Sequence, residues 1–219
     1  MSGVAQFPDP FLLALLFGAL ALVPFMVVMV TAFTKIVVVL MLVRNALGIQ
    51  QTPPNTVLFG LGIVLTLYIS MPVIGQVWRE LSAPDQRYET AQDWIAAANR
   101  AKEPFRAYLL KYTPETERAF FLAATERVWP EEAREGVTGE DLVILIPSFT
   151  VSQLTKAFEI GFLLYLPFIA IDLIVSNILL AMGMMMVSPL TISLPFKLFL
   201  FVVVDGWTRL IHGLVLSYA

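Results

Sequence analysis

The sequence predicts an all-α, membrane-associated protein made of helical hairpins with a charged helical insert. Hydrophobic residues make up 58% of the 219 residues and charged residues only 14%, whereas a soluble domain carries about 25% charged residues. The charged residues are also concentrated, because residues 79–141 hold 22 of the 31. The few charges elsewhere cannot form a water-soluble surface. We therefore expect most of the chain to lie in lipid or inside an assembly.

The composition also argues against several classes of function. The net charge is −3 and no basic patch stands out, which disfavours nucleic acid as a partner. The chain has no cysteine and one histidine, His212, so thiolate metal sites and cysteine nucleophiles are excluded. The HExxH and GxSxG motifs of metalloproteases and serine hydrolases do not occur. We expect a protein that is not an enzyme and that uses no metal and no cofactor.

The first apolar segment is expected to be retained and to bend. Residues 1–11 carry an acid and two prolines where a secretory signal would carry Lys or Arg. Residues 11–34 contain no charged residue, and the apolar stretch continues to residue 43. At about 1.5 Å per residue this exceeds one bilayer crossing, so the helix must tilt or bend. Pro24 is the expected kink.

A second apolar segment follows after a turn. Residues 44–55, RNALGIQQTPPN, contain a glycine and a proline pair, which is typical of a tight turn. Residues 57–78 are uncharged and long enough to span a membrane, and Gly60 and Gly62 permit close contact with a neighbouring helix. Residues 1–78 are therefore predicted to form an N-terminal hydrophobic hairpin.

The charged insert, residues 79–141, is expected to contain two or three short amphipathic helices and no sheet. Thr113, followed by a proline and an acid, fits a helix N-cap. Thr138 with Asp141 three residues later resembles a second cap. The insert is small for an independent fold, so we expect it to pack against neighbours on the extracytoplasmic side.

Residues 142–219 are predicted to form a C-terminal hydrophobic hairpin with a Met-rich loop. Residues 160–186 are long enough to span a membrane, and residues 196–219 close the chain as one helix. That last helix is a poor lipid-facing span and is better explained if protein surrounds it. It contains the charged residues Lys197, Asp205 and Arg209 as well as His212.

The distribution of cations gives an orientation. Lys35 and Arg44 flank the first turn, and Lys197 follows the last one. Cytoplasmic loops carry an excess of Lys and Arg. Both turns are therefore expected on the cytoplasmic side, with the charged insert and both termini outside.

Four separated motifs resemble the FliP/SctR family, the inner-membrane export-gate subunits of flagellar and virulence type III secretion systems. The first is the turn RNALGIQQTPPN. The others are PSFTVSQLTKAFEIG (147–161), PFIAIDLIVSNILLAMGMMMVSP (167–189) and LPFKLFLFVVVDGW (194–207). The resemblance extends over essentially the whole chain and is loosest in the charged insert. The segment SNILLAMGMMMVSPLTISLPFKL and the absence of a cleavable signal favour the injectisome branch over the flagellar branch.

The resemblance implies a protein-conducting channel of the bacterial inner membrane and not an enzyme. Five copies would form a ring with one SctT/FliR-like and several SctS/FliQ-like subunits, next to an SctU/FlhB-like subunit. Unfolded secreted proteins would pass through the centre. In this family the hairpins wind into a helical assembly, largely on the outer side of the membrane. Such an assembly accounts for the polar last helix.

Ionisable residues inside the apolar segments form two local pairs. Lys156 and Glu159 are three residues apart, and Asp205 and Arg209 are four apart, so each pair can meet on one helix face, where His212 can join the second. Two interpretations are open. The pairs either neutralise each other within a helix, or they bridge copies and fix the register of a ring.

Asp172 has no oppositely charged neighbour within one helical turn. It therefore needs a partner from elsewhere, and Lys197 or Lys35 are the candidates. A proton relay through Asp172 is the less favoured alternative, although acids inside membrane helices are typical of relays.

Four of the nine methionines lie in residues 182–186. Met184, Met185 and Met186 are consecutive, so a helix would spread them around most of its circumference. Gly183 and Pro189 favour a loop instead. Because Met is flexible and unbranched, we interpret the three as an adaptable pore gasket rather than as core residues.

A function of another class is kept as the alternative. A small ion- or proton-coupled transporter subunit would use Asp172 and Asp205, and inverted repeats would support it. The two hairpins show only a loose likeness, each having a Pro-bearing turn, and share no motif.

Overall fold

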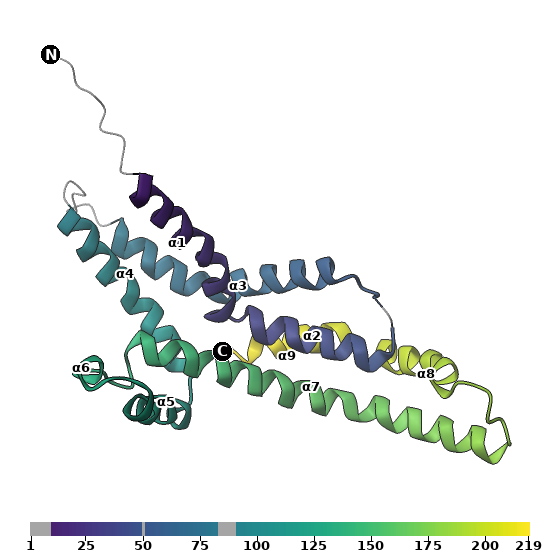
Figure 1. Ribbon diagram of the computed structural model, residues 1–219. Coiled ribbons are helices and arrows are strands. Elements are labelled where there is room, and N and C mark those ends of the chain that lie inside the picture. Colours follow the sequence, from purple (N-terminus) through teal and green to yellow (C-terminus); the bar gives the residue numbers. More distant parts are fainter. Residues whose placement is uncertain (1–9, 50, 83–90) are drawn as a thin grey trace.

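The computed structural model describes residues 10–49, 51–82 and 91–219, which form helices and no strand. The predicted all-α class is confirmed. The molecule is elongated (Figure 1). The loop between α7 (Leu142–Ala181) and α8 (Pro189–Val203) lies at one end, and the charged insert lies at the other.

The central element is α2 (Phe33–Leu47), which packs against α7, α8 and α3 (Asn55–Leu81). It is buried around much of its circumference, as expected for an apolar helix enclosed by others. Its fully or almost fully buried side chains form the middle of the main core: Ile36, Val39, Leu40, Val43 and Leu47. The turn predicted at residues 44–55 is confirmed, since α2 ends at Leu47 and α3 begins at Asn55.

Two glycines allow α2 to lie close to its neighbours. A Cβ atom on Gly62 of α3 would be 2.5 Å from Cγ2 of Val37, and one on Gly161 of α7 would collide with Leu42. The close helix contact predicted at Gly62 is thus confirmed. The close contact predicted at Gly60 is not made within this chain. Nothing lies within 4 Å of the corresponding position on Gly60.

The first apolar stretch bends, but not at Pro24. That proline lies inside α1 (Pro10–Met29), and a bend of 62° separates Leu20–Met29 from α2. A threonine hydroxyl takes up a backbone carbonyl at the break: Oγ1 of Thr34 donates to the carbonyl of Val28 (2.7 Å). Side chains that intrude on the backbone ladder are a recognised cause of sharp bends.

The C-terminal stretch is two helices rather than the single helix expected over residues 196–219. A bend of 59° separates α8 from α9 (Gly206–Leu216). Asp205 ends the first helix because it adopts a left-handed conformation, with φ of 52°. Gly206 then lies so close to the ring of Phe201 that a Cβ atom would collide with it. The preceding helix, α7, is longer than predicted, at 40 residues.

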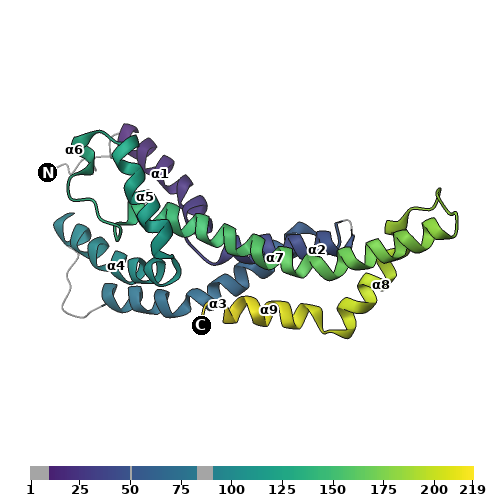
Figure 2. The same ribbon diagram turned by 90° about the horizontal axis from the view of Figure 1, so that it is seen from below.

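The charged insert contains α4 (Ala91–Tyr112), α5 (Glu115–Val128) and α6 (Glu131–Arg134), so the predicted number of helices and absence of a sheet are confirmed for its described part. The helices were expected to be short, but α4 has 22 residues and continues through Pro104. Helix α4 packs along α3 and α7, and α5 packs on α7 (Figure 2). A second, smaller core forms there around Tyr108, Leu109, Leu145 and Phe149. The insert therefore packs directly against the apolar helices α3 and α7.

The two expected caps differ in detail from the prediction. Thr113 does not cap α5: its hydroxyl donates back to the carbonyl of Leu109 (2.7 Å), and Pro114 is the N-cap residue. At the second site Asp141, not Thr138, is the N-cap residue of α7. Its Oδ2 accepts the backbone N–H of Thr138 (2.7 Å) and the Thr138 hydroxyl (3.0 Å). These two bonds, the backbone one first, lower the pKa of the Asp141 carboxyl.

Within the described residues two helices, α3 and α7, are long and apolar enough to cross a membrane, and the number rises to four if each bent pair is one span. In the most apolar window of either helix only 17% of residues are buried inside the chain. Large apolar surfaces are therefore left for lipid or other chains to cover. The division into parts at residues 78 and 141 stays a prediction.

Candidate functional site

The methionine loop, residues 182–188, lies at the tip of the hairpin formed by α7 and α8 (Figure 2). It is not helical, as predicted. Gly183 has φ of 72°, the left-handed conformation that glycine adopts at a helix C-terminus without strain. The backbone N–H of Gly183 donates to the carbonyl of Leu180 (3.0 Å), and that of Met184 to Leu179 (2.9 Å). Pro189 then begins α8 at its first position.

The three consecutive methionines are uncovered in the chain. The exposed fraction rises from 44% at Met184 to 82% at Met185 and 101% at Met186. Burial in the core of this chain, the ordinary role of methionine, is therefore contradicted. The pore-gasket role stays a prediction, because it concerns an assembly of several chains.

A charge cluster lies below this loop, where α7, α8 and α2 meet. It consists of Asp172, Ser193, Lys197 and the backbone carbonyl of Ala46. Nζ of Lys197 lies 2.6 Å from Oδ2 of Asp172 and donates to the carbonyl of Ala46 (3.1 Å). The Ser193 hydroxyl donates to Oδ1 of Asp172 (2.6 Å). The prediction that Asp172 takes a partner from elsewhere is confirmed, and the partner is Lys197 rather than Lys35.

The cluster specifies how the hairpin sits on α2. Lys197 is only 3% exposed, and its ammonium group bonds to the Asp172 carboxylate and to the Ala46 carbonyl. A buried ion pair adds little net stability over apolar packing, but removing one partner costs about 3–5 kcal/mol because the other charge stays buried. Lys197 and Asp172 are thus satisfied without a second copy, so an inter-copy bridge is not needed for this pair.

Lys35 belongs to a different polar network, which the sequence analysis missed. Its Nζ donates to the Ser217 hydroxyl (2.8 Å) and lies 3.6 Å from the centre of the Tyr218 ring. The Tyr218 hydroxyl donates to Oε1 of Gln153 (2.7 Å), and the Tyr112 hydroxyl donates to the Tyr218 carbonyl. The network joins α2, α4 and α7 to the chain after α9. Gln153 in an apolar stretch was the one available signal.

The two local pairs do not form salt bridges among the residues that the structure describes. Lys156 turns to the carbonyl of Tyr112 (3.4 Å), while Glu159 is exposed. Asp205 adopts a left-handed conformation and lies just before α9, whereas Arg209 lies within α9. The spacing rule for two residues of one continuous helix therefore does not apply to this pair. Neutralisation within a helix is therefore wrong for both pairs. Bridges between copies stay a prediction.

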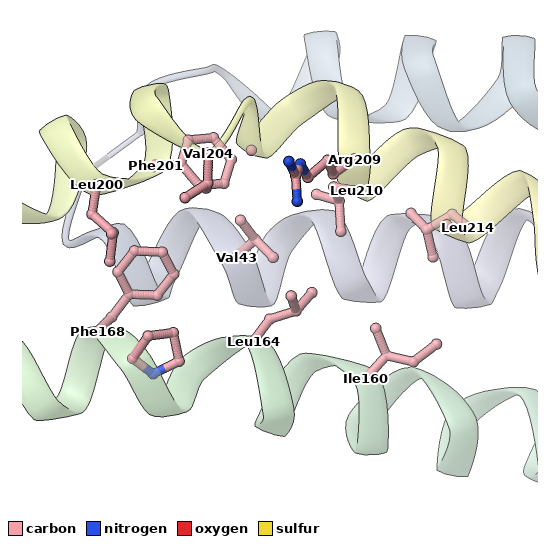
Figure 3. Close-up of a pocket in the computed structure, with 13 residues that line it drawn as sticks. Val43, Ile160, Leu164, Phe168, Leu200, Phe201, Val204, Arg209, Leu210 and Leu214 are labelled. Carbon is pink, nitrogen blue, oxygen red and sulfur yellow. The ribbon is translucent and has the colours of Figure 1, made fainter.

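An apolar cavity of about 550 Å³ lies beside these residues, between α2, α7, α8 and α9 (Figure 3). The side chains of Val43, Leu164 and Phe168 point into it, and Arg209 is the one charged residue among the described residues of its wall. The exposed His212 does not line it. The cavity has room for apolar side chains, and Arg209 offers a positive charge to an acidic side chain there. No cluster of three or more acidic or histidine side chains suited to a metal occurs within the described residues.

Comparisons with known proteins agree with the resemblance noted in the sequence. The FliP family model matches residues 16–214. The chain is 57% identical to "Probable translocation protein y4yL" of Sinorhizobium fredii, with 96% of each chain covered. It is 50% identical to "Yop proteins translocation protein R" of Yersinia pestis, over 97% of this chain and 98% of that one.

A third relative points the same way. "Virulence protein YscR" of Salmonella typhimurium is 48% identical over 91% of this chain and 93% of its own. These names agree with the expected injectisome branch. Since the family model covers most of the chain and the relatives match it over nearly their full length, this chain belongs to the FliP family.

Proposed function

We propose that this protein is a core subunit of a type III secretion export gate, in which copies of the chain surround a channel for unfolded secreted proteins. Membership of the FliP family supports this function, and so do relatives named for Yop translocation, virulence and hypersensitivity response secretion. The protein acts by forming a passage and not as an enzyme.

The observation that carries the assembly is the exposed charge on apolar helices. Glu159 of α7 is exposed between Phe158 and Phe162, whose exposed fractions are 57% and 61%. Arg209 is exposed beside an apolar cavity. A charge facing lipid is costly, whereas one facing another protein surface can be paired. These surfaces are therefore better suited to neighbouring subunits than to acyl chains.

The methionine loop is the proposed gate. Repeated around a ring, Met184, Met185 and Met186 would form an apolar collar that excludes water and ions when it is closed. The same unbranched side chains could move aside for a polypeptide of any sequence. The turn at Gly183 and the helix start at Pro189 present the collar at the tip of the hairpin.

The charge cluster holds this tip in place. Asp172 is bonded to Lys197 and Ser193, which fixes α8 against α7 directly below the loop. This geometry favours a structural role over a proton relay. It also weakens the alternative of an ion-coupled transporter, because Asp172 is paired and Asp205 lies at a helix break.

We place the protein in the bacterial inner membrane as a multi-pass component, with the charged insert on the periplasmic side. Arg44, which binds the carbonyl of Pro53 and Oδ1 of Asn55 in the first loop, is the loop cation that supports this orientation. Lys35 and Lys197 are buried in the chain and contribute less. A cysteine at the exposed Glu115 should react with a membrane-impermeant thiol reagent from the periplasm; labelling only from the cytoplasm would invert the topology.

The proposed partners are further copies of the chain, five in all, with SctS/FliQ-like, SctT/FliR-like and SctU/FlhB-like subunits. The test is the native mass of the complex after co-expression with the neighbouring membrane genes. We expect several copies of this chain in one particle. A stable monomer under these conditions would overturn the proposal.

A further inference from the structure

One face of α7 is apolar and exposed, and it carries a single acid. Phe162, Leu163 and Leu166 follow Glu159 by three, four and seven residues, which places the four side chains on one side of the helix. The three apolar side chains are 61%, 64% and 45% exposed, and Glu159 is exposed as well. This spacing is typical of a helix that lays one face into a groove of another protein. These four residues are called the docking face below.

The cavity between α2, α7, α8 and α9 is complementary to this face in chemistry (Figure 3). Its volume is about 550 Å³, whereas a cavity of about 150 Å³ already holds a benzene molecule. The described residues of its wall are apolar apart from Arg209, which is exposed and forms no salt bridge within the described part of the chain. Asp205 does not line the cavity. The cavity can therefore take apolar side chains together with one acid.

Gly213, in the same wall, lets a helix approach closely. No atom lies within 4 Å of the position that a Cβ atom would occupy on Gly213. Gly213 follows Arg209 by four residues in α9, so the open backbone and the guanidinium group lie on one side of that helix. Small residues allow membrane helices to pack backbone to backbone. A neighbouring helix can therefore reach Arg209 along this part of α9.

The docking face and the cavity lie on different sides of α7. Ile160, Leu164 and Pro167 line the cavity, and Glu159, Leu163 and Leu166 each precede one of them by one position. One position corresponds to a rotation of about 100° around a helix. The docking face is therefore turned away from the cavity of its own chain but is free to enter that of another copy. Contacts between two different surfaces repeat head to tail, and they close into a ring when the rotation permits.

We propose that the docking face of one copy occupies this cavity in the next copy, with Glu159 paired to Arg209; this inference rests on the proposed function. Each copy supplies one acid and one cation, so every contact of a closed ring neutralises both. A phospholipid in the cavity could offer a phosphate to Arg209, but it would leave Glu159 facing lipid, which is costly. A partner of another sequence would have to supply a cation and an acid at the same two places.

The first experiment reverses the charges in the full chain, co-expressed with the neighbouring membrane genes, and measures the complex by native mass. Glu159→Arg and Arg209→Glu should each reduce the amount of complex at least about tenfold, because like charges would then meet at the contact. The double variant Glu159→Arg/Arg209→Glu should recover most of it. His212→Glu, which places an acid on α9 outside the cavity wall, is the matched control and should assemble like the parent.

Parental amounts of complex in both single variants, or a double variant no better than the single ones, would overturn the pairing.

The second experiment locates the contact with a photoreactive amino acid. Benzoylphenylalanine in place of Phe162 keeps an aromatic ring on the docking face, and the products of irradiation are mapped by mass spectrometry. We expect products the size of two chains, attached at cavity residues such as Leu210 and Gly213. The same probe at Val128, which is 74% exposed on α5, is the control and should give no product with the cavity. Products confined to one chain, or to lipid, would overturn the docking.

The native mass of the parent separates this docking from the proposed function. If the parent stays a monomer, the proposed function fails and the docking fails with it. If the parent forms its complex but the probe at Phe162 does not reach the cavity of another copy, the export-gate function stands and only the docking is wrong.

Discussion

The base and the tip of the hairpin formed by α7 and α8 differ in how far interactions within one chain pair or cover their side chains. At the base, Asp172 and Lys197 are paired inside the chain and anchored to α2. At the tip, and on the outer face at Glu159, apolar and charged side chains are left uncovered. The base therefore defines the fold of one chain, whereas the tip and outer face define what several chains do together.

Reversing the charge at the base should have the largest effect. Lys197→Glu places two carboxylates together in a buried site, and loss of one partner alone costs about 3–5 kcal/mol. We expect the chain to lose its fold or its complex on a native gel. Asp172→Lys combined with Lys197→Asp should partly restore both. Normal thermal stability of the single Lys197→Glu variant would show that the pair is not structural.

A neutral variant at the same place separates the structural role from a relay. Asp172→Asn keeps the size of the side chain but removes its charge, and its single amide oxygen can accept from only one of the two donors, Ser193 or Lys197. We expect reduced thermal stability together with reduced export. A variant that assembles with the stability of the parent but exports nothing would favour the proton relay instead.

Reversal on the outer face should act on assembly only. Glu159 is exposed and has no salt bridge among the described residues, so Glu159→Lys should leave the stability of the single chain within about 0.5 kcal/mol. If Glu159 pairs with a cation of another copy, the complex should be lost on a native gel. Glu159→Gln is the matched control and should weaken the complex less. Intact complex with the lysine variant would exclude Glu159 from the interface.

Changes at the tip should alter permeability and not assembly. Replacing Met184, Met185 and Met186 by alanine removes most of the apolar volume from side chains that contact little in one chain. The complex should therefore form normally, and ion or dye leakage through the membrane should increase. If this variant exports proteins and leaks no more than the parent, the gasket role is wrong.

The smallest effect is expected at the far end of α7. Bonds from Thr138 stabilise the ionised Asp141 carboxylate, so its pKa is lower in the folded state. This stabilisation is present above the unfolded pKa of about 3.9 and is lost as pH falls through the lowered folded value. Asp141→Asn should lower stability slightly at neutral pH and reduce the acid sensitivity of unfolding, because the uncharged amide no longer titrates. Equal acid sensitivity in parent and variant would contradict this.

Local features could be predicted where the backbone preference of a single residue type determines them. The low charge indicated apolar helices, and Gly183 and Pro189 indicated a loop at the methionines. The glycine and prolines after α2 likewise indicated a turn. In each case the effect depends on a conformational preference that the residue carries wherever it stands.

The sequence by itself therefore determined the helical class, the loop positions and the fact that Asp172 needs a partner. Tertiary structure decided which partner that is, since Lys197 was one of two candidates and the contact spans 25 positions. It also decided where the apolar stretches bend and that Lys156 turns from Glu159 to the Tyr112 carbonyl. The network of Lys35 with Ser217 joins residues 182 positions apart. Spacing rules assume a continuous helix in isolation, whereas these contacts depend on which helices pack together.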